Sequence, residues 1–180
     1  MSSQNIFILV NIIGGISVLG TYVLGITLFP EHRDDLWGGV QGKLRHVFIF
    51  SMFLAAAGYL TFVYMSIFQE GISSDRIGVS NRTFLIILIS GFFLFSASLW
   101  MPSLLAYIIS ANNLWWIVSI ASLWVTAISL LGLSVIVGSS PIFGLSSISK
   151  YLSLVGLAYI TCHCLIIDGI IWVLLFHKYP

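Results

Sequence analysis

Long apolar runs, separated by short polar stretches, dominate the pattern of this chain. The uncharged runs cover approximately residues 6–29, 47–68, 83–109, 114–137 and 151–176. A helix needs roughly 20 apolar residues to cross the hydrocarbon core of a bilayer, and each run reaches that length. The chain lacks the alternating segments of about ten residues that build outer-membrane barrels, and a helix satisfies its own backbone polar groups in lipid. The pattern predicts an all-α, polytopic integral membrane protein: a compact bundle of about five transmembrane helices in a single domain, residues 1–180.

Composition agrees with this class and argues against others. Hydrophobic residues make up 59% of the 180 positions and charged residues 7%, and the mean hydropathy is +1.08. Water-soluble domains carry about 25% charged residues, so this chain cannot cover a globular surface in water. A disordered chain and a disulfide-stapled secreted module are excluded as well. A net charge of +1 without a basic run argues against nucleic acid as a partner, because phosphate binding needs clustered Lys and Arg. The expected partner is the lipid bilayer.

The first and third runs each admit two interpretations. The first follows a leader without positive residues and precedes no small-residue cleavage site, so it is predicted to be a retained span rather than a secretory signal. The third contains Pro102, whose missing N–H leaves the carbonyl of Ser98 without its helical donor. A single kinked or tilted crossing is preferred, and the alternative is a crossing that ends near Trp100 and continues as an interfacial segment.

The basic residues indicate an orientation by a small margin. An odd number of crossings puts the two termini on opposite faces. The face of the first connection, the third connection and the C-terminus holds Arg33, Lys43, Arg45 and Lys178, and the other face holds Arg76, Arg82 and Lys150. Since Lys and Arg are enriched in cytoplasmic loops, this count of four against three favours an outside N-terminus and a cytoplasmic C-terminus.

Asp168 is the one formally charged residue that lies deep in a predicted span. It precedes the end of the fifth run by eight residues, which is roughly 12 Å at about 1.5 Å per residue. A lone Asp at the bilayer centre costs about 2.5 to 3.5 kcal/mol on the insertion scale. Two interpretations stay open: a protonatable or ion-coordinating group that faces the bundle interior, or a neutral carboxyl hydrogen-bonded to a hydroxyl or a freed carbonyl of another helix.

His163 lies near the middle of the same span and suggests a pair with Asp168. On an α-helix, five residues at about 100° each leave the two side chains roughly 140° apart, so the sequence predicts no pair within the helix. A structural histidine hydrogen-bonded across helices is preferred to a ligand or proton carrier. Cys162 and Cys164 diverge on a helix and cannot converge on one tetrahedral ion, so we expect packing residues, no metal and no disulfide.

Small and hydroxyl residues recur at helical spacing on three of the spans. The stripes are Ser17, Thr21 and Gly25; Ser51, Ala55 and Gly58; and Ser119, Ser122, Thr126 and Ser129. Small residues let the backbones of neighbouring helices approach in lipid, so helix contact is the preferred interpretation. The alternative for the fourth span is that hydroxyls such as those of Ser122 and Thr126 line a narrow path or bind Asp168.

The first connection, residues 30–46, carries six of the thirteen charged residues. A solvated connector with Asp and Arg pairs is the preferred interpretation, and an interfacial or docking site is the alternative. The candidate residues of such a site are Glu31, His32, Arg33, Asp34, Asp35 and His46. No cofactor is predicted. Because His32, His46 and His177 fall near one face of the bundle, a haem or metal site there is kept as a minor alternative.

Three functions are compatible with these residues. The first is binding or conducting a small ligand or ion within the bundle, centred on Asp168. Its candidate site residues are Asp168, His163, Ser98, Ser122 and Thr126. Close behind is a non-catalytic accessory or scaffolding subunit of a larger membrane complex, which packs on other transmembrane subunits or on a second copy. A membrane-embedded lipid-modifying enzyme ranks third, since the chain shows neither a nucleophile with its base nor paired carboxylates, and an enzyme is not expected.

Overall fold

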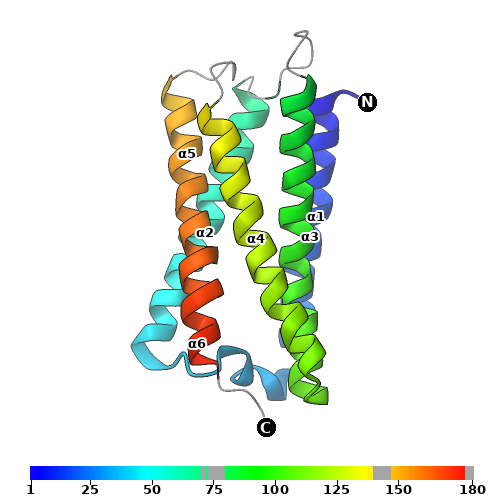
Figure 1. Cartoon of the computed structure of the whole chain (residues 1–180), viewed down its shortest axis with the longest axis vertical. Coiled ribbons are helices and arrows are strands. Elements are labelled where there is room, and N and C mark those ends of the chain that lie inside the picture. Colours follow the sequence, from blue (N-terminus) through cyan, green and yellow to red (C-terminus); the bar gives the residue numbers. More distant parts are fainter. Residues whose placement is uncertain (70–71, 73–79, 140–146, 177–180) are drawn as a thin grey trace.

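The computed structural model describes residues 1–69, 72, 80–139 and 147–176. The secondary structure in these residues is helical, and they contain no strand. Four of the long helices are α1 (Ser3–Leu28), α2 (Gly42–Phe68), α3 (Ser80–Ser110) and α4 (Asn113–Ser139). The fifth is continuous through α5 (Ser147–Cys162), the π-helix η3 (His163–Trp172) and the short α6 (Val173–Leu175). Together they form one elongated bundle with the N-terminus at one end and α6 at the other (Figure 1).

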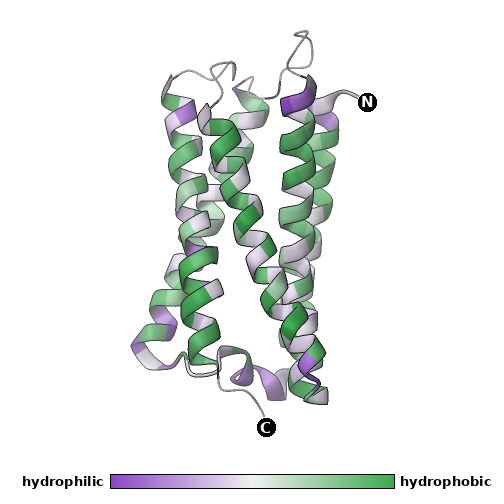
Figure 2. Ribbon diagram, in the orientation of Figure 1, coloured by the Kyte–Doolittle hydropathy of each residue, from purple (hydrophilic) through white to green (hydrophobic). Residues whose placement is uncertain are grey.

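All of these long helices have the length and the apolar composition of membrane-spanning helices. Within the described residues, five helices are long and apolar enough to cross a membrane. Apolar residues predominate along the middle of the bundle, and hydrophilic residues lie mainly near its two ends (Figure 2). The fold class predicted from the sequence is therefore confirmed: an all-α bundle with the helices of a multi-pass membrane protein.

The third helix runs without interruption through its proline. Pro102 is exposed on α3, which continues for eight further residues to Ser110. Next to it, the Ser103 hydroxyl donates to the carbonyls of Leu99, at 2.6 Å, and of Trp100, at 2.9 Å. A hydroxyl of this kind partly compensates for hydrogen bonds that a proline removes. The third run thus forms one continuous helix, which does not end near Trp100, and its single crossing of the membrane stays a prediction.

The helices pack as two groups that α4 joins. In one group α3 lies against both α1 and α4, and in the other α2 lies against α5. The contacts of α4 with α5 and η3 connect the groups. In Figure 1 the lower part of α2 swings away from α1, and the connection after α1 runs across the end of the bundle beneath it. The bundle is therefore closely packed at the N-terminal end and wider at the other end.

A core of mostly aliphatic residues fills the end beside the N-terminus and is called the N-terminal core below. Its buried residues are Phe7, Ala55, Tyr59, Phe62, Ile72, Ile86, Phe93, Leu94, Ala127, Leu130, Leu133, Val137, Leu157, Ile160 and Cys164. Here α1 and α2 are linked by the Gln4 amide, which donates to the Ile67 carbonyl at 2.9 Å, and by the Tyr59 hydroxyl, which donates to Asn11 Oδ1 at 2.8 Å. Polar groups in this core thus serve to hold two helices together.

Within this end, α2 and α5 touch through their backbones. A Cβ atom added to Gly58 would lie 2.6 Å from the carbonyl oxygen of Gly156, so only glycine fits there. Ser51 and Ala55 of the same predicted stripe are buried, as helix contact requires. On α1 the prediction is confirmed at Gly25, which packs against Met101 of α3, and wrong for Ser17, which is exposed. Gly14, outside the predicted stripe, faces Leu94 of α3 instead.

Large aromatic residues fill the opposite end, which is called the loop-end core below. Its buried residues are Leu36, Val40, Phe48, Met101, Leu104, Leu105, Tyr107, Trp116, Leu123, Trp172 and Phe176. The Trp172 ring lies 5.5 Å from the Trp100 ring, 5.9 Å from that of Trp116 and 4.8 Å from that of Phe176. Aromatic rings of this size span the wider separation between the helices.

The connection after α1 covers this core. It folds into two short 3₁₀ turns, η1 (Pro30–His32) and η2 (Asp35–Trp37). Leu36 and Val40 point into the loop-end core, and Trp172 Nε1 donates to the Leu36 carbonyl at 3.2 Å. The Gly39 N–H donates to the carbonyl of Leu175 at 3.0 Å. The connection is therefore more than the solvated connector that the sequence predicts, because part of it belongs to the core.

The connection between α3 and α4 consists of Ala111 and Asn112 alone. Ala111 adopts a positive φ of 52°, and its N–H donates to the Tyr107 carbonyl at 2.8 Å. The Asn112 side chain then accepts a hydrogen bond from the Leu114 N–H at 2.9 Å and caps the start of α4. The two helices form a tight antiparallel hairpin.

Candidate functional site

Asp168 lies in the middle of a π-helical segment. The ten residues of η3 follow α5 without a break and contain both His163 and Asp168. A π-helix bonds each backbone N–H to the carbonyl five residues earlier, and such segments are rare and are found frequently at functional sites. The fifth helix therefore departs from α-helical geometry at the residues that the sequence marks as chemically distinct.

This geometry brings His163 and Asp168 together. His163 Nε2 lies 3.4 Å from Asp168 Oδ2, within ion-pair distance. The expectation that the two residues could not pair is wrong, because it assumed about 100° per residue, as in an α-helix. In a π-helix the turn is wider, so residues five apart return to the same side.

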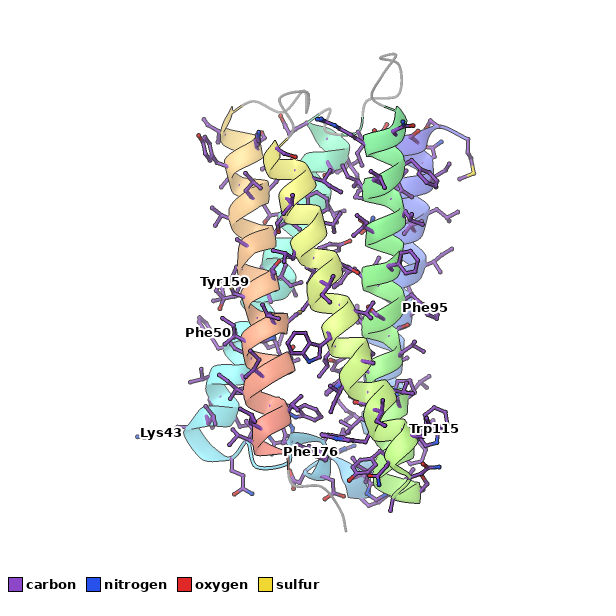
Figure 3. The ribbon with its side chains drawn as sticks, viewed as in Figure 1. Lys43, Phe50, Phe95, Trp115, Tyr159 and Phe176 are labelled. Carbon is purple, nitrogen blue, oxygen red and sulfur yellow. The ribbon has the colours of Figure 1, made fainter. Side chains whose placement is uncertain are left out.

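A chain of polar side chains extends from this pair to the outer side of the bundle. Ser51 of α2 lies 2.8 Å from His163 Nδ1 and 3.1 Å from the Tyr159 hydroxyl, measured from its Oγ. His163 and Ser51 are each 5% exposed, whereas Tyr159 lies on the outer side of α5 (Figure 3). The predicted histidine that bonds across helices is confirmed, and the same ring also faces the acid.

The hydrogen bonds among Tyr159, Ser51, His163 and Asp168 allow two arrangements of the protons. In one, the Tyr159 hydroxyl donates to Ser51, Ser51 donates to His163 Nδ1, and the Nε2–H of His163 faces the Asp168 carboxylate. In the other, Nδ1–H donates to Ser51 and a protonated Asp168 faces the bare Nε2. A neutral imidazole has one donor and one acceptor nitrogen, so the second arrangement holds one proton more than the first, on Asp168. Changing from the first arrangement to the second takes up one proton at the Tyr159 end and exchanges the donor and acceptor nitrogens of the ring. These side chains can therefore take up, hold and release one proton.

The Asp168 carboxyl is only partly satisfied by protein groups. In the described part of the chain its one ion-pair partner is His163, at a distance longer than the 2.7–2.9 Å or so of a good charge-assisted hydrogen bond. Its side chain is 29% exposed, and the phenol of Tyr22 on α1 lies within electrostatic range of it. The chain thus leaves part of the carboxyl uncovered.

Aromatic rings from three helices surround this part of the bundle. The Tyr22 ring lies 5.6 Å from that of Trp100 on α3, which in turn lies 5.5 Å from the Trp172 ring, one turn after Asp168. Trp100 Nε1 is buried and has no hydrogen-bond partner among the described residues. Sequence reasoning missed Tyr22 and Trp100 as site residues, since nothing in their spacing relates them to Asp168.

The remaining candidates on α3 and α4 are engaged elsewhere. Thr126 bonds to Ser96 of α3 with 2.8 Å between the hydroxyl oxygens, as helix contact predicts. The hydroxyl of Ser122 donates to the Ser119 carbonyl at 2.7 Å, and that of Ser98 donates to the Phe95 carbonyl at 2.7 Å. Among the described residues, none of these three hydroxyls bonds to Asp168.

The charged residues of the first connection form local pairs. Arg45 Nη1 lies 2.9 Å from Asp34 Oδ1, and His32 Nδ1 lies 2.9 Å from Asp35 Oδ2. Arg33 donates to the carbonyl of Ile26 at 2.9 Å. The predicted Asp and Arg pairing is confirmed.

The histidines proposed for haem or metal have separate surroundings. His46 Nδ1–H donates to the Gly42 carbonyl at 3.0 Å, whereas His32 bonds to Asp35. His177 lies outside the described residues, so the haem or metal alternative stays a prediction. In residues 1–69, 72, 80–139 and 147–176, no three His, Cys, Asp or Glu side chains gather in a way that could hold a metal ion.

Comparison of the chain with protein-family models, with curated proteins and with solved structures found no match. The function is therefore argued from the site itself.

Proposed function

We propose that the protein binds a small ligand or ion, specifically a cation or proton, at Asp168 within the membrane. The observation that carries the proposal is the His163–Asp168 pair on a π-helix, with one side of the carboxyl left open. The histidine supplies a group that exchanges protons with the acid, and the open side supplies room for a cation.

A purely structural carboxyl is a poorer explanation of this geometry. An Asp in the centre of a span costs about 2.5 to 3.5 kcal/mol, and a structural acid lowers that cost by forming short hydrogen bonds on both oxygens. Asp168 instead has one contact of 3.4 Å and a side chain that is 29% exposed. A bound cation or proton supplies the compensation that the described protein groups do not.

Cation binding and proton release are coupled at such a site. A cation that binds the carboxylate displaces its proton, and His163 with Ser51 and Tyr159 provides a route of hydrogen bonds that can take the proton up. From Tyr159 to Asp168 the route advances about 13 Å along the helix axis. In the orientation that the basic residues favour, its Asp168 end is nearer the cytoplasmic face, so conduction is the finer form of the proposal.

The proposal is tested by modification of Asp168 in lipid nanodiscs. Dicyclohexylcarbodiimide is a lipophilic reagent for protonated carboxyl groups, and mass spectrometry locates and times the label. We expect labelling at Asp168 that slows as the pH is raised, and that slows about tenfold when a cation is present at ten times its dissociation constant. The cations tested are Li⁺, Na⁺, K⁺, ammonium and organic ammonium ions.

Two variants complete this experiment. Asp168→Asn should lose the label, whereas Glu31→Gln, which changes an exposed carboxylate of the first connection, should behave as the wild-type protein. A labelling rate at Asp168 that no cation and no change of pH alters contradicts the proposal.

A second candidate, an accessory or scaffolding subunit, is favoured by the surface of α1. Phe7 and Gly25 are the buried residues of this helix, and a Cβ added at Gly15 or Gly20 meets nothing within 4 Å. Small residues on an outer face let another helix approach. Gly20→Leu should then abolish a complex seen by native mass spectrometry while Asp168→Asn preserves it. Gly58 and Ser122 cannot serve in this test, because both lie in contacts within the chain.

A further inference from the structure

Resting on the proposed function, we infer that the ligand at Asp168 is an organic monocation of the ammonium class that carries apolar groups. The carboxylate holds its charge, and the rings of Tyr22, Trp100 and Trp172 surround its apolar part. This deepens the proposal by naming the class of ligand.

Ring geometry is the first argument. Trp100 stands between Tyr22 and Trp172, with centroid distances of 5.6 and 5.5 Å and interplanar angles of 33° and 74°. The rings therefore do not form one parallel stack. Trp172 is buried, whereas Tyr22 and Trp100 are half-buried and keep part of their surface uncovered by the chain. Aromatic faces attract cations within about 6 Å, and quaternary ammonium groups are commonly recognised by cages of such rings.

Proximity to the acid is the second argument. Trp172 follows Asp168 by one turn of the same helix, and its ring is linked through that of Trp100 to the ring of Tyr22. The aromatic residues and the open side of the carboxyl thus belong to one region, where charge and apolar surface are both available. An organic cation matches both properties.

The donor set is the third argument, because it does not suit a bare metal ion. Ca²⁺ takes six to eight oxygen ligands or so, and Mg²⁺ requires near-octahedral coordination. Asp168 stands with one imidazole and one phenol nearby, and the described residues hold no group of three or more potential metal ligands. An organic cation carries a loosely held hydration shell and needs fewer polar partners.

Trp100 also carries a polar group in this region. Its Nε1 is buried without a hydrogen-bond acceptor among the described residues, and an ammonium ion with apolar groups offers no acceptor to it. The inference therefore rests on the ring of Trp100 and not on its N–H, and substitutions can separate the two.

The test compares a cation with its neutral isostere. Benzyltrimethylammonium is the probe, and neopentylbenzene has the same shape with carbon in place of the charged nitrogen. We expect benzyltrimethylammonium to slow carbodiimide labelling of Asp168 in nanodiscs and neopentylbenzene to leave it unchanged. Trp100→Leu should raise the probe concentration needed for half-protection by about tenfold or more.

Matched variants control for damage to the fold. Trp115→Leu removes an exposed tryptophan at the same end of the bundle (Figure 3) and should leave protection unchanged. Trp100→Phe keeps a ring and removes the N–H, so it should retain most of the affinity, and Tyr22→Leu tests the second ring if Trp100→Leu fails to fold.

Each outcome has a defined meaning. If inorganic cations or pH alter the labelling but benzyltrimethylammonium does not, the inference is overturned and the proposed function stands. Equal protection by neopentylbenzene, or unchanged protection in folded Trp100→Leu and Tyr22→Leu, also overturns the inference. If no cation and no pH change alters the labelling, the proposed function fails and the inference fails with it.

Discussion

The helices of this bundle pack closely at one end and are separated by large side chains at the other. In the N-terminal core the helices approach until backbones touch, as at Gly58 and Gly156, and side-chain hydrogen bonds such as Tyr59 to Asn11 link neighbouring helices. In the loop-end core the helices are held apart by aromatic rings, and the carboxyl of Asp168, 29% exposed, lies one turn before Trp172. The first end is held by small residues that let backbones touch, and the second by large residues that fill a wider separation.

The proposed site draws on both kinds of packing. The contact of Ser51 with His163 comes from the close approach of α2 to α5, whereas the rings of Trp100 and Trp172 belong to the wider end. Aromatic faces attract cations, so under the proposed function the wider end supplies the surface for a ligand and the closely packed pair of helices positions the histidine.

The largest expected effect comes from removing the central ring of the loop-end core. Trp172→Ala abolishes three ring contacts and the hydrogen bond to the Leu36 carbonyl, and should lower the free energy of unfolding by about 3–5 kcal/mol. Circular dichroism during SDS titration in mixed micelles measures it. Trp115→Ala, at an exposed position, is the control and should change it by less than about 1 kcal/mol. Equal losses in both variants would show that the rings do not support this end.

A single added methyl group should disrupt the backbone contact between α2 and α5. Gly58→Ala places its Cβ against the Gly156 backbone, and the strain should lower the free energy of unfolding by about 1–3 kcal/mol. At Gly15 a Cβ meets nothing within 4 Å, so Gly15→Ala should be neutral or stabilising by up to about 1 kcal/mol, since Ala favours helix. The same micelle titration compares them. Indistinguishable free energies of unfolding for the two variants would contradict a backbone contact at Gly58 that supports the fold.

Two glycines with positive φ, Gly38 in the first connection and Gly42 at the start of α2, test how tightly the connection packs on the loop-end core. Gly38 has φ 53° and ψ −124°, and its added Cβ would lie 2.7 Å from the Phe176 ring; Gly42 has φ 56° and open space. Ala at Gly42 should cost about 1 kcal/mol from its backbone alone. At Gly38 the cost should be greater by about 1 kcal/mol, because this conformation favours glycine strongly and the ring must move. Melting temperatures measure the difference, and a greater loss at Gly42 would be inconsistent with the docked loop.

The smallest expected effect on stability is at Asp168. Asp168→Asn keeps the size of the side chain and removes a charge from the span, so the free energy of unfolding should stay within about 1 kcal/mol of the wild-type value. Carbodiimide labelling of residue 168, by contrast, should be lost. A destabilisation of about 3 kcal/mol or more, typical of a broken buried ion pair, would assign the carboxyl to the fold instead.

Span positions were predictable because lipid imposes one simple requirement. Each predicted run extends at most one residue beyond a long apolar helix, and the third helix is continuous through Pro102. Length and the absence of charge are enough for this, since they reflect transfer into hydrocarbon rather than any particular contact. The fold of the first connection was harder to predict from the sequence, because the burial of Leu36 and Val40 depends on the rings of a segment more than a hundred residues away.

The candidate site was predictable only in part. Asp168 and His163 stand out by composition, but their pairing depends on a π-helix that α-helical periodicity does not foresee. Ser51 was assigned to packing, and its bonds to His163 and Tyr159 arise from the close approach of α2 to α5. Tyr22 and Trp100 join the region through contacts between helices that are distant in sequence, which spacing along one helix cannot indicate.

The connection of Ala111 and Asn112 also limits how the helices can be rearranged. Two residues reach at most about 7 Å in extended form, whereas α3 and α4 have 31 and 27 residues and are each roughly 40 Å long or more. The end of α3 therefore stays beside the start of α4, and neither helix can move to another place in the bundle without the other. The rest of the bundle packs on this pair, α1 against α3 and α5 against α4.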